Sequence, residues 1–168
     1  NGFGATPLTK YRRHVLMLHP HTVIVYDELE ASEAVRWEWL LHSPTEFKMD
    51  ATKKTLSTNN KIKGWMAVTQ LFGGHVFTLS QTDRFVVPPA ITGAEYPNQW
   101  HLTARVDGCS ATRFLAIIQV GDEAVPIINR DGDTFNVGDW TIKAVLDASK
   151  APELAVSHRT EQAVFSYG

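Results

Sequence analysis

The sequence contains a single cysteine, Cys109, among 168 residues. One cysteine excludes a disulfide within the chain and a zinc site built from cysteine thiolates. No apolar run approaches the roughly 20 residues that a membrane-spanning helix requires, so we expect no membrane contact. The formal net charge is only −2, which argues against nucleic acid as a partner held by bulk electrostatics. A globular protein without covalent cross-links is what remains.

Motifs of the common catalytic sites are also missing. The chain has no Gly-x-Ser-x-Gly sequence, no phosphate-binding loop and no dinucleotide fingerprint. Cys109 lies in the sequence Asp-Gly-Cys-Ser, which predicts a turn with no helix N-terminus behind it to activate the thiol. We therefore expect no catalytic residue and no cofactor-binding residue in this chain.

Composition and length indicate one folded domain. The chain is 43% hydrophobic and 20% charged, values typical of globular proteins and unlike those of disordered chains. Its length suits a single domain, so residues 1–168 are predicted to form one unit. The first residue is Asn1 rather than methionine, and we expect the chain to be a fragment of a longer polypeptide. Any targeting signal would then lie upstream.

Alternation of hydrophobic and polar residues predicts β-strands along the whole chain. In residues 35–42 (VRWEWLLH), every second side chain from Val35 is hydrophobic, including Trp37 and Trp39. The stretch 22–29 (TVIVYDEL) is rich in β-branched residues and reads as a further strand. Residues 11–19 precede it across a short turn, which predicts a hairpin.

The second half of the chain continues this pattern. Residues 99–106 and 111–120 are predicted to be neighbouring strands around Asp107-Gly108, and Gly73-Gly74 predicts another hairpin. Short strands without a helical period predict an all-β fold, an antiparallel two-sheet β-sandwich. We expect the apolar segment around Phe114 and Ile118 to be covered on both faces and to share an inter-sheet core with Trp37 and Trp39.

Histidines near the first turn are the first candidate for a metal site. His14, His19, His21 and Asp27 have side chains that could bind zinc. Pro20 separates two of them at the predicted turn and breaks their shared face, and His14 points away from His19 in a regular strand. Solvated turn histidines are the favoured interpretation, and no metal is expected here.

Acidic residues give two more candidates, both of which we interpret as structural. Asp27 and Glu28 are adjacent in a strand and face opposite ways, so they cannot flank one scissile bond. Asp131-Gly132-Asp133 resembles the start of a calcium loop, but hydrophobic residues stand where further oxygen ligands are needed. This second stretch predicts a hairpin turn, and no metal ligand is expected.

Tryptophans supply the remaining candidate site. Sugar rings stack on aromatic faces, and the chain has five tryptophans. Trp65 and Trp100 are the two candidate carbohydrate contacts, because Trp65 opens a strand after polar residues and Trp100 adjoins a proline-rich stretch. Packing of both side chains in the core or at its rim is the alternative that this pattern favours.

Three segments resemble a known family. They are residues 11–18 (YRRHVLML), residues 23–31 (VIVYDELEA) and residues 37–43 (WEWLLHS). In this order they look like the C-terminal half of heparinase II/III-like polysaccharide lyases. The resemblance implies an N-terminal α/α toroid joined to antiparallel β-sheet domains, in bacterial enzymes of the periplasm or the cell exterior. Such enzymes cleave uronic-acid polysaccharides by β-elimination.

The resemblance covers the first quarter of the chain. The family's catalytic and metal-binding motifs do not occur in this sequence. In that family the catalytic Tyr and His or Asn belong to the toroid, and the metal-binding cluster lies upstream of the arginine-rich strand. We therefore expect a non-catalytic C-terminal β-sandwich, whose partners are the N-terminal catalytic domain of the same polypeptide and, for the whole enzyme, an acidic polysaccharide. A carbohydrate-binding module and a purely structural sandwich are the alternatives.

Overall fold

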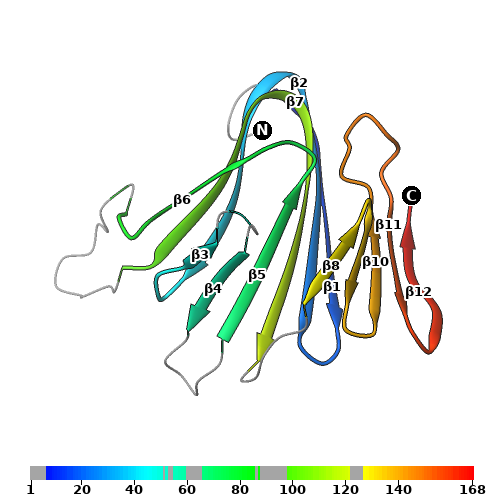
Figure 1. Ribbon diagram of the computed structural model, residues 1–168. Helices are drawn as coiled ribbons and strands as arrows, with labels where there is room; N and C mark the ends of the chain where they lie inside the picture. The colour runs from blue at the N-terminus through cyan, green and yellow to red at the C-terminus, as the bar shows by residue number, and fades with distance from the viewer. Residues whose placement is uncertain are drawn as a thin grey trace.

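The chain folds into strands and connecting loops, as a computed structural model shows (Figure 1). The structure describes residues 7–50, 52, 55–59, 66–85, 87, 98–121 and 127–168. In this part of the chain there is no helix, and so none that is long and apolar enough to span a membrane. The strands are β1 (Leu8–Leu18), β2 (Thr22–Ser43), β3 (Lys48–Asp50), β4 (Thr55–Asn59), β5 (Met66–Gly73), β6 (Thr78–Thr82), β7 (Trp100–Gly121), β8 (Ile128–Asp131), β9 (Thr134–Val137), β10 (Trp140–Ala144), β11 (Leu154–His158) and β12 (Glu161–Tyr167).

Two antiparallel sheets contain all of these strands. The first has the order β1-β2-β7-β5-β4-β3, with β6 also paired to β7, and the second has the order β12-β11-β10-β9-β8. Every strand pair is antiparallel. The predicted all-β, two-sheet antiparallel sandwich is therefore confirmed.

Two long strands, β2 and β7, fold the first sheet over on itself. Each has 22 residues, and together they form the arch at the top of Figure 1. Their pairing shifts register between Glu30 and Val35 and again before Trp37. At the bend of β7, Gly108 has a φ of +72°, a backbone conformation that favours glycine. One sheet thus supplies two facing layers, and the second sheet forms a third.

This bend corrects three sequence predictions. Residues 22–29 and 35–42 belong to one strand, β2, and the predicted strands 99–106 and 111–120, except for residue 99, belong to one strand, β7. The turn-forming residues between them sit at the bend and do not reverse the chain. Gly73-Gly74 is not a hairpin turn either, because β5 pairs with the second half of β7 and β6 with the first half. The hairpins β1–β2 and β8–β9 are confirmed.

Gly74 is required by a close approach between the two sheets. A Cβ atom at this position would lie 2.1 Å from the carbonyl oxygen of Leu146, in the β10–β11 loop. The amide of Gly74 donates to the carbonyl of Arg113 at 3.0 Å. The absence of a side chain therefore allows the chain to leave β5 directly beneath that loop.

The hydrophobic core has one part between the sheets and another inside the folded first sheet. Tyr26 and Leu115 of the first sheet pack against Phe135 and Ile142 of the second. The predicted group of Trp37, Trp39, Phe114 and Ile118 does form one cluster, with Ile118 at its margin, but this cluster fills the inside of the arch. The prediction of an inter-sheet position was wrong, because both layers around it belong to one continuous sheet.

Candidate functional site

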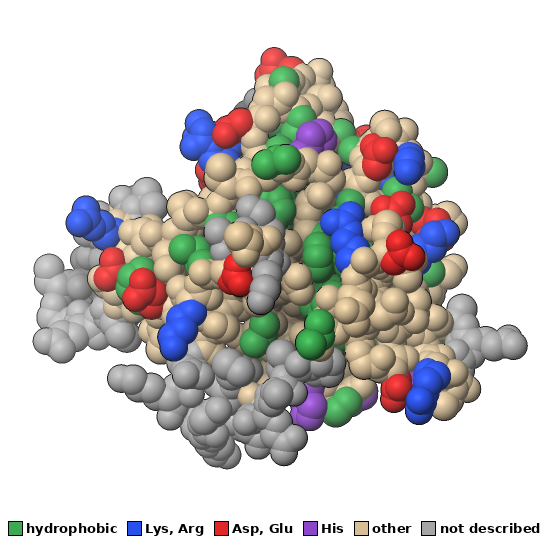
Figure 2. All heavy atoms as spheres, viewed as in Figure 1, with side chains coloured by type: hydrophobic (Ala, Val, Ile, Leu, Met, Phe, Trp, Pro, Cys, Tyr) green, Lys and Arg blue, Asp and Glu red, His purple; other side chains and the backbone are tan. Residues whose placement is uncertain are grey.

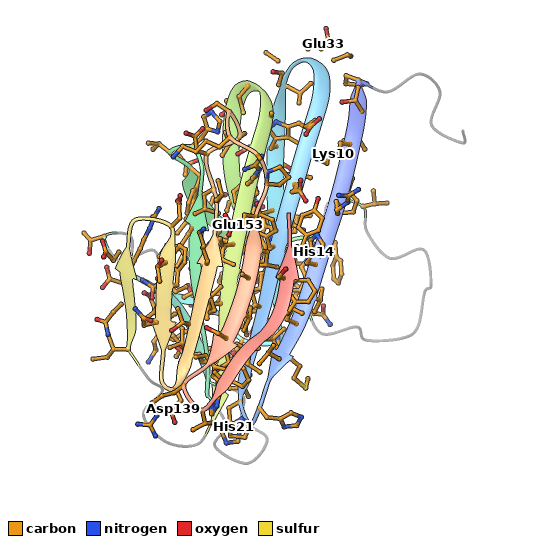
Figure 3. The ribbon with its side chains drawn as sticks, turned by 90° about the vertical axis from the view of Figure 1, so that its right-hand side faces the viewer. Lys10, His14, His21, Glu33, Asp139 and Glu153 are labelled. Atoms are coloured by element: carbon orange, nitrogen blue, oxygen red, sulfur yellow. The ribbon has the colours of Figure 1, made fainter. Side chains whose placement is uncertain are left out.

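A cluster of polar side chains lies at the open side of the sandwich, between β1 and β12. The register of the first hairpin places Arg12 opposite Glu28 and His14 opposite Tyr26. These side chains face the second sheet, because Tyr26 belongs to the core between the sheets. β1 is an edge strand, so the side chains of Lys10 and His14 reach the gap beside β12 (Figure 3). We call Lys10, Arg12, His14, Glu28 and Tyr167 the edge cluster.

Glu28 is the buried acid of the edge cluster. It is only 1% exposed, and the ammonium nitrogen of Lys10 lies 2.8 Å from its Oε2. Burial alone raises the pKa of Glu28, but the ion pair with Lys10 and the nearby hydroxyl of Tyr167 outweigh this effect and hold the pKa below its usual value. The contact with Glu28 also raises the pKa of Lys10, and Glu30, whose Oε1 is 3.1 Å from the Lys10 ammonium, makes a second contribution. The carboxylate and the ammonium therefore stabilise each other's charged form.

Tyr167 joins β12 to the charged groups of β1. The guanidinium of Arg12 donates to the Tyr167 hydroxyl and lies 5.3 Å from the centre of its ring. The ring of His14 packs 4.3 Å from the same ring, centre to centre. His14 Nε2 is 3.8 Å from Glu28 Oε1, too far for a hydrogen bond. The cluster thus joins the edge strands of the two sheets. Lys10 already has a partner in Glu28, and Arg12 has one in the Tyr167 hydroxyl.

A tyrosine and an arginine continue this polar layer into the interior. The hydroxyl of Tyr26 donates to the carbonyl of Val145 at 2.8 Å. Burial raises the pKa of Tyr26 to about 12, so the hydroxyl keeps its proton and remains a donor at physiological pH. Arg113 is only 5% exposed and donates to carbonyls of the same β10–β11 loop. These groups position a loop and present no convergent acid and base.

The lowered pKa of Glu28 predicts a pH-dependent loss of stability. The unfolded chain binds the proton more tightly, so the contribution of ionised Glu28 is complete above about pH 4.5 and declines as the pH falls through the lower folded pKa. We expect Glu28→Gln to lower the free energy of unfolding by about 1–3 kcal/mol at pH 7. Urea titrations at pH 7 and pH 3 should show the difference from the wild type shrinking at the lower pH.

Glu30→Gln is the matched control, because Glu30 contacts the same lysine from an exposed position. We expect this control to change stability by less than about 1 kcal/mol at either pH. An equal loss in the two variants, or a Glu28→Gln effect that does not change with pH, would contradict the assignment.

The residues considered for zinc do not come together. Asp27 pairs with Arg13, at 2.6 Å from Nε to Oδ1 and 2.8 Å from the second guanidinium nitrogen to Oδ2. It lies opposite Arg13 on β2, whereas His19 and His21 lie in the turn before Thr22. Five residues of strand span roughly 17 Å. In the described parts of the chain, no group of three or more His, Cys, Asp or Glu side chains could hold a metal ion.

The structure describes all but one of the other candidates from the sequence, the acidic pairs and the two tryptophans. Asp131 and Asp133 form the β8–β9 hairpin, in which Asp131 lies opposite Thr134. Asp27 and Glu28 face opposite sides of β2, as their adjacency predicts. Trp100 is half-buried and packs on a small cluster around Phe47 and Leu102. Trp65 lies outside the described residues.

A groove of about 640 Å³ runs between the bend of the first sheet and the β10–β11 loop. Its lining includes Glu33, His75, Cys109 and Asp147. Burial raises the pKa of the Cys109 thiol, which keeps it protonated and a weak nucleophile. The imidazole of His75 lies 3.3 Å from the Thr112 hydroxyl. The groove therefore lacks an activated nucleophile.

The face of β1 that is turned away from the second sheet carries an exposed apolar stripe, on the same side of the sheet as Val25 and Leu29 of the cluster inside the arch. Tyr11, Val15 and Met17 lie on one face of this edge strand, with Arg13 between the first two, and are 56%, 61% and 71% exposed. Large hydrophobic side chains grouped on a long sheet edge are a common sign of a surface that another chain segment covers. Elsewhere, the view in Figure 2 shows acidic and basic side chains intermixed, without an extended area of one charge.

Solved structures share this fold. The heparinase III-BT4657 gene product with methylated lysines matches 97% of this chain with a TM-score of 0.61 and 15% identity, over 24% of its own length. The heparan sulfate lyase HepC from Pedobacter heparinus matches 96% of this chain with a TM-score of 0.58 and 17% identity, over 24% of its own length.

Comparisons of sequence gave no match. No family model matches the chain, and neither does any curated protein. The heparinase-like resemblance seen in three short segments is therefore supported by structure, at the level of fold. Two heparinase III structures and HepC repeat this arrangement of strands across nearly the whole chain, which spans about a quarter of their length.

Proposed function

We propose that this chain is a non-catalytic β-sandwich domain of a heparinase-like polysaccharide lyase. In the complete polypeptide it packs on the catalytic domain, outside the cytoplasm, and the enzyme cleaves an acidic, uronic-acid-containing polysaccharide by β-elimination. The observation that carries this proposal is the fold match, which covers at least 94% of the chain but only 23–24% of each lyase. The rest of such an enzyme has ample length to contain the catalytic machinery.

The arrangement of polar groups supports a non-catalytic role. Elimination from a uronate requires a group that neutralises the carboxylate, a base for the C5 proton and an acid for the leaving oxygen. The edge cluster contains Arg12, His14 and Tyr167, but these groups fasten two strands to each other and Glu28 lies among them. An anionic sugar at this place would have to displace the pairs already formed.

The exposed stripe on β1 supports packing against another domain. Tyr11, Val15 and Met17 would lose contact with water if a neighbouring domain covered this edge, with a gain of about 25 cal/mol for each Å² of apolar surface. A carbohydrate-binding module would instead present a row of exposed aromatic rings. Trp100, the described candidate for such a ring, is half-buried.

An activity assay tests the proposal. We expect no turnover when the isolated chain is incubated with heparan sulfate or alginate, followed by the ultraviolet absorbance of unsaturated uronates. A known lyase provides the positive control on the same substrates. Saturable turnover that survives repurification would overturn the non-catalytic assignment. Tight binding of either polysaccharide that Trp100→Ala abolishes would favour the carbohydrate-binding module instead.

A further inference from the structure

Two histidines from distant parts of the chain form a close pair on the folded first sheet. His42 of β2 lies directly opposite His101 of β7. Their ring centres are 4.5 Å apart, with an angle of 66° between the planes. Neighbours on both strands, Leu41 and Leu102, pack in a hydrophobic cluster on the other face. Side chains alternate along a strand, so the two imidazoles share the outer face of the arch.

The separation of the rings suits joint coordination of one metal ion. Zinc–imidazole bonds are about 2.0–2.1 Å long, which puts the centre of each bound ring roughly 3.2 Å from the metal. Two imidazoles that bind one ion then have centres roughly 4.5 Å apart when the angle at the metal is 90° and roughly 5.2 Å apart when it is tetrahedral. The observed 4.5 Å lies in this interval. The rings are tilted by 66° and are not stacked face to face.

The surroundings hold the pair in place and leave it accessible. The ring of Phe85 lies 6.4 Å from the ring of His101 and is nearly perpendicular to it, at 88°. His42 is exposed and His101 is half-buried. Thr82 of β6 lies opposite His101 on its other side. Among the described residues, neither imidazole has a hydrogen-bond or ion-pair partner that would compete with a metal ion.

We propose that His42 and His101 form a two-histidine site for a divalent transition-metal ion of the zinc, nickel and copper group. Imidazole nitrogen suits these ions, whereas Mg²⁺ and Ca²⁺ prefer oxygen ligands. Two protein ligands leave the remaining coordination positions to water or to a ligand from solution. This inference does not depend on the proposed lyase domain. It departs from the expectation, drawn from the sequence, that the chain has no metal ligand.

Titration of the purified chain with Zn²⁺ or Ni²⁺, followed by calorimetry and by the histidine ring signals in NMR spectra, tests the site. We expect one saturable site, with the ring signals of His42 and His101 shifted by Zn²⁺ or broadened by Ni²⁺. His42→Ala and His101→Ala should each weaken binding at least tenfold. Mg²⁺ should produce no change in these signals.

His21→Ala is the matched control, because His21 lies in the first turn beside His19. We expect this variant to bind like the wild type. Thermal unfolding without metal establishes that each variant is folded, and the NMR result on the wild type needs no variant. Binding that His21→Ala abolishes, or Zn²⁺ and Ni²⁺ titrations that leave the His42 and His101 signals unchanged, would overturn the proposal.

Discussion

Arg113→Met is expected to lower the free energy of unfolding by about 3–5 kcal/mol. The guanidinium of Arg113 is buried and donates to the carbonyls of Val145, Asp147 and Lys150, at 3.2, 2.9 and 2.7 Å. Methionine keeps much of the apolar stem but donates no hydrogen bond, so the Lys150 carbonyl loses its 2.7 Å donor, while the carbonyls of Val145 and Asp147 keep only the Tyr26 hydroxyl and the Lys150 amide. An unpaired buried carbonyl costs about 1–3 kcal/mol. The gain from no longer burying a charge offsets only part of this loss.

Chemical denaturation of the wild type and the variant measures the effect, and amide hydrogen exchange locates it. We expect faster exchange in the β10–β11 loop, where the amide of Val145 donates to the carbonyl of Glu153. Arg130→Met is the matched control, because Arg130 donates to one exposed carbonyl, that of Gly132. A loss of similar size in both variants would mean that Arg113 does not act through the loop. Arg113→Lys should recover only part of the stability, because an ammonium cannot reproduce the fork of donors.

The fold class could be predicted because it depends on short-range patterns. Alternation in residues 35–42 and β-branched composition in residues 22–29 both reflect a period of two, which is a local property of strands. The turn at Asp131-Gly132 was predicted for the same reason, since two adjacent residues determine it. Such features need no knowledge of which strands become neighbours.

The bend of the first sheet could not be predicted because its local signals match those of a hairpin. Asp107-Gly108 is a strong turn sequence. Here, however, Gly108 lies at a bend within β7, and the strand stays paired with β2 on both sides of the bend. Gly73-Gly74 has the same composition, and Gly74 is needed because the Leu146 carbonyl approaches it. At position 74, glycine is therefore required by a segment that is far away in the sequence. Composition alone does not distinguish the two uses of glycine.

Only part of the edge cluster could be predicted from the sequence. Arg12 and His14 occupy alternate positions in the strand predicted for residues 11–19, so a shared face could be inferred for them, whereas Lys10 lies just before that predicted strand. Tyr167 lies at the far end of the chain and reaches them through the packing of two sheets. The His42 and His101 pair has the same origin, because only the register of β2 against β7 makes these residues neighbours. Sites built across strands far apart in sequence require the topology first.

Trp39→Ala is expected to cost about 3–5 kcal/mol of stability, among the largest effects of a single substitution in this chain. Trp39 is 5% exposed and packs inside the arch with Phe77, Ala104 and Phe114. Truncation would leave a cavity lined by both layers of the folded sheet. Those layers are tied by continuous strands at the bend, so they cannot readily close over the lost volume.

Trp39→Phe separates packing from hydrogen bonding. The indole N–H of Trp39 is buried and makes no hydrogen bond with the described residues, so replacing it with a phenyl ring removes no polar contact. We expect this variant to lose only about 1–2 kcal/mol, most of it from reduced contact. Urea denaturation of both variants measures the difference. A midpoint unchanged by Trp39→Ala would show that the arch does not depend on this side chain, and equal losses in both variants would point to a polar role for the indole nitrogen.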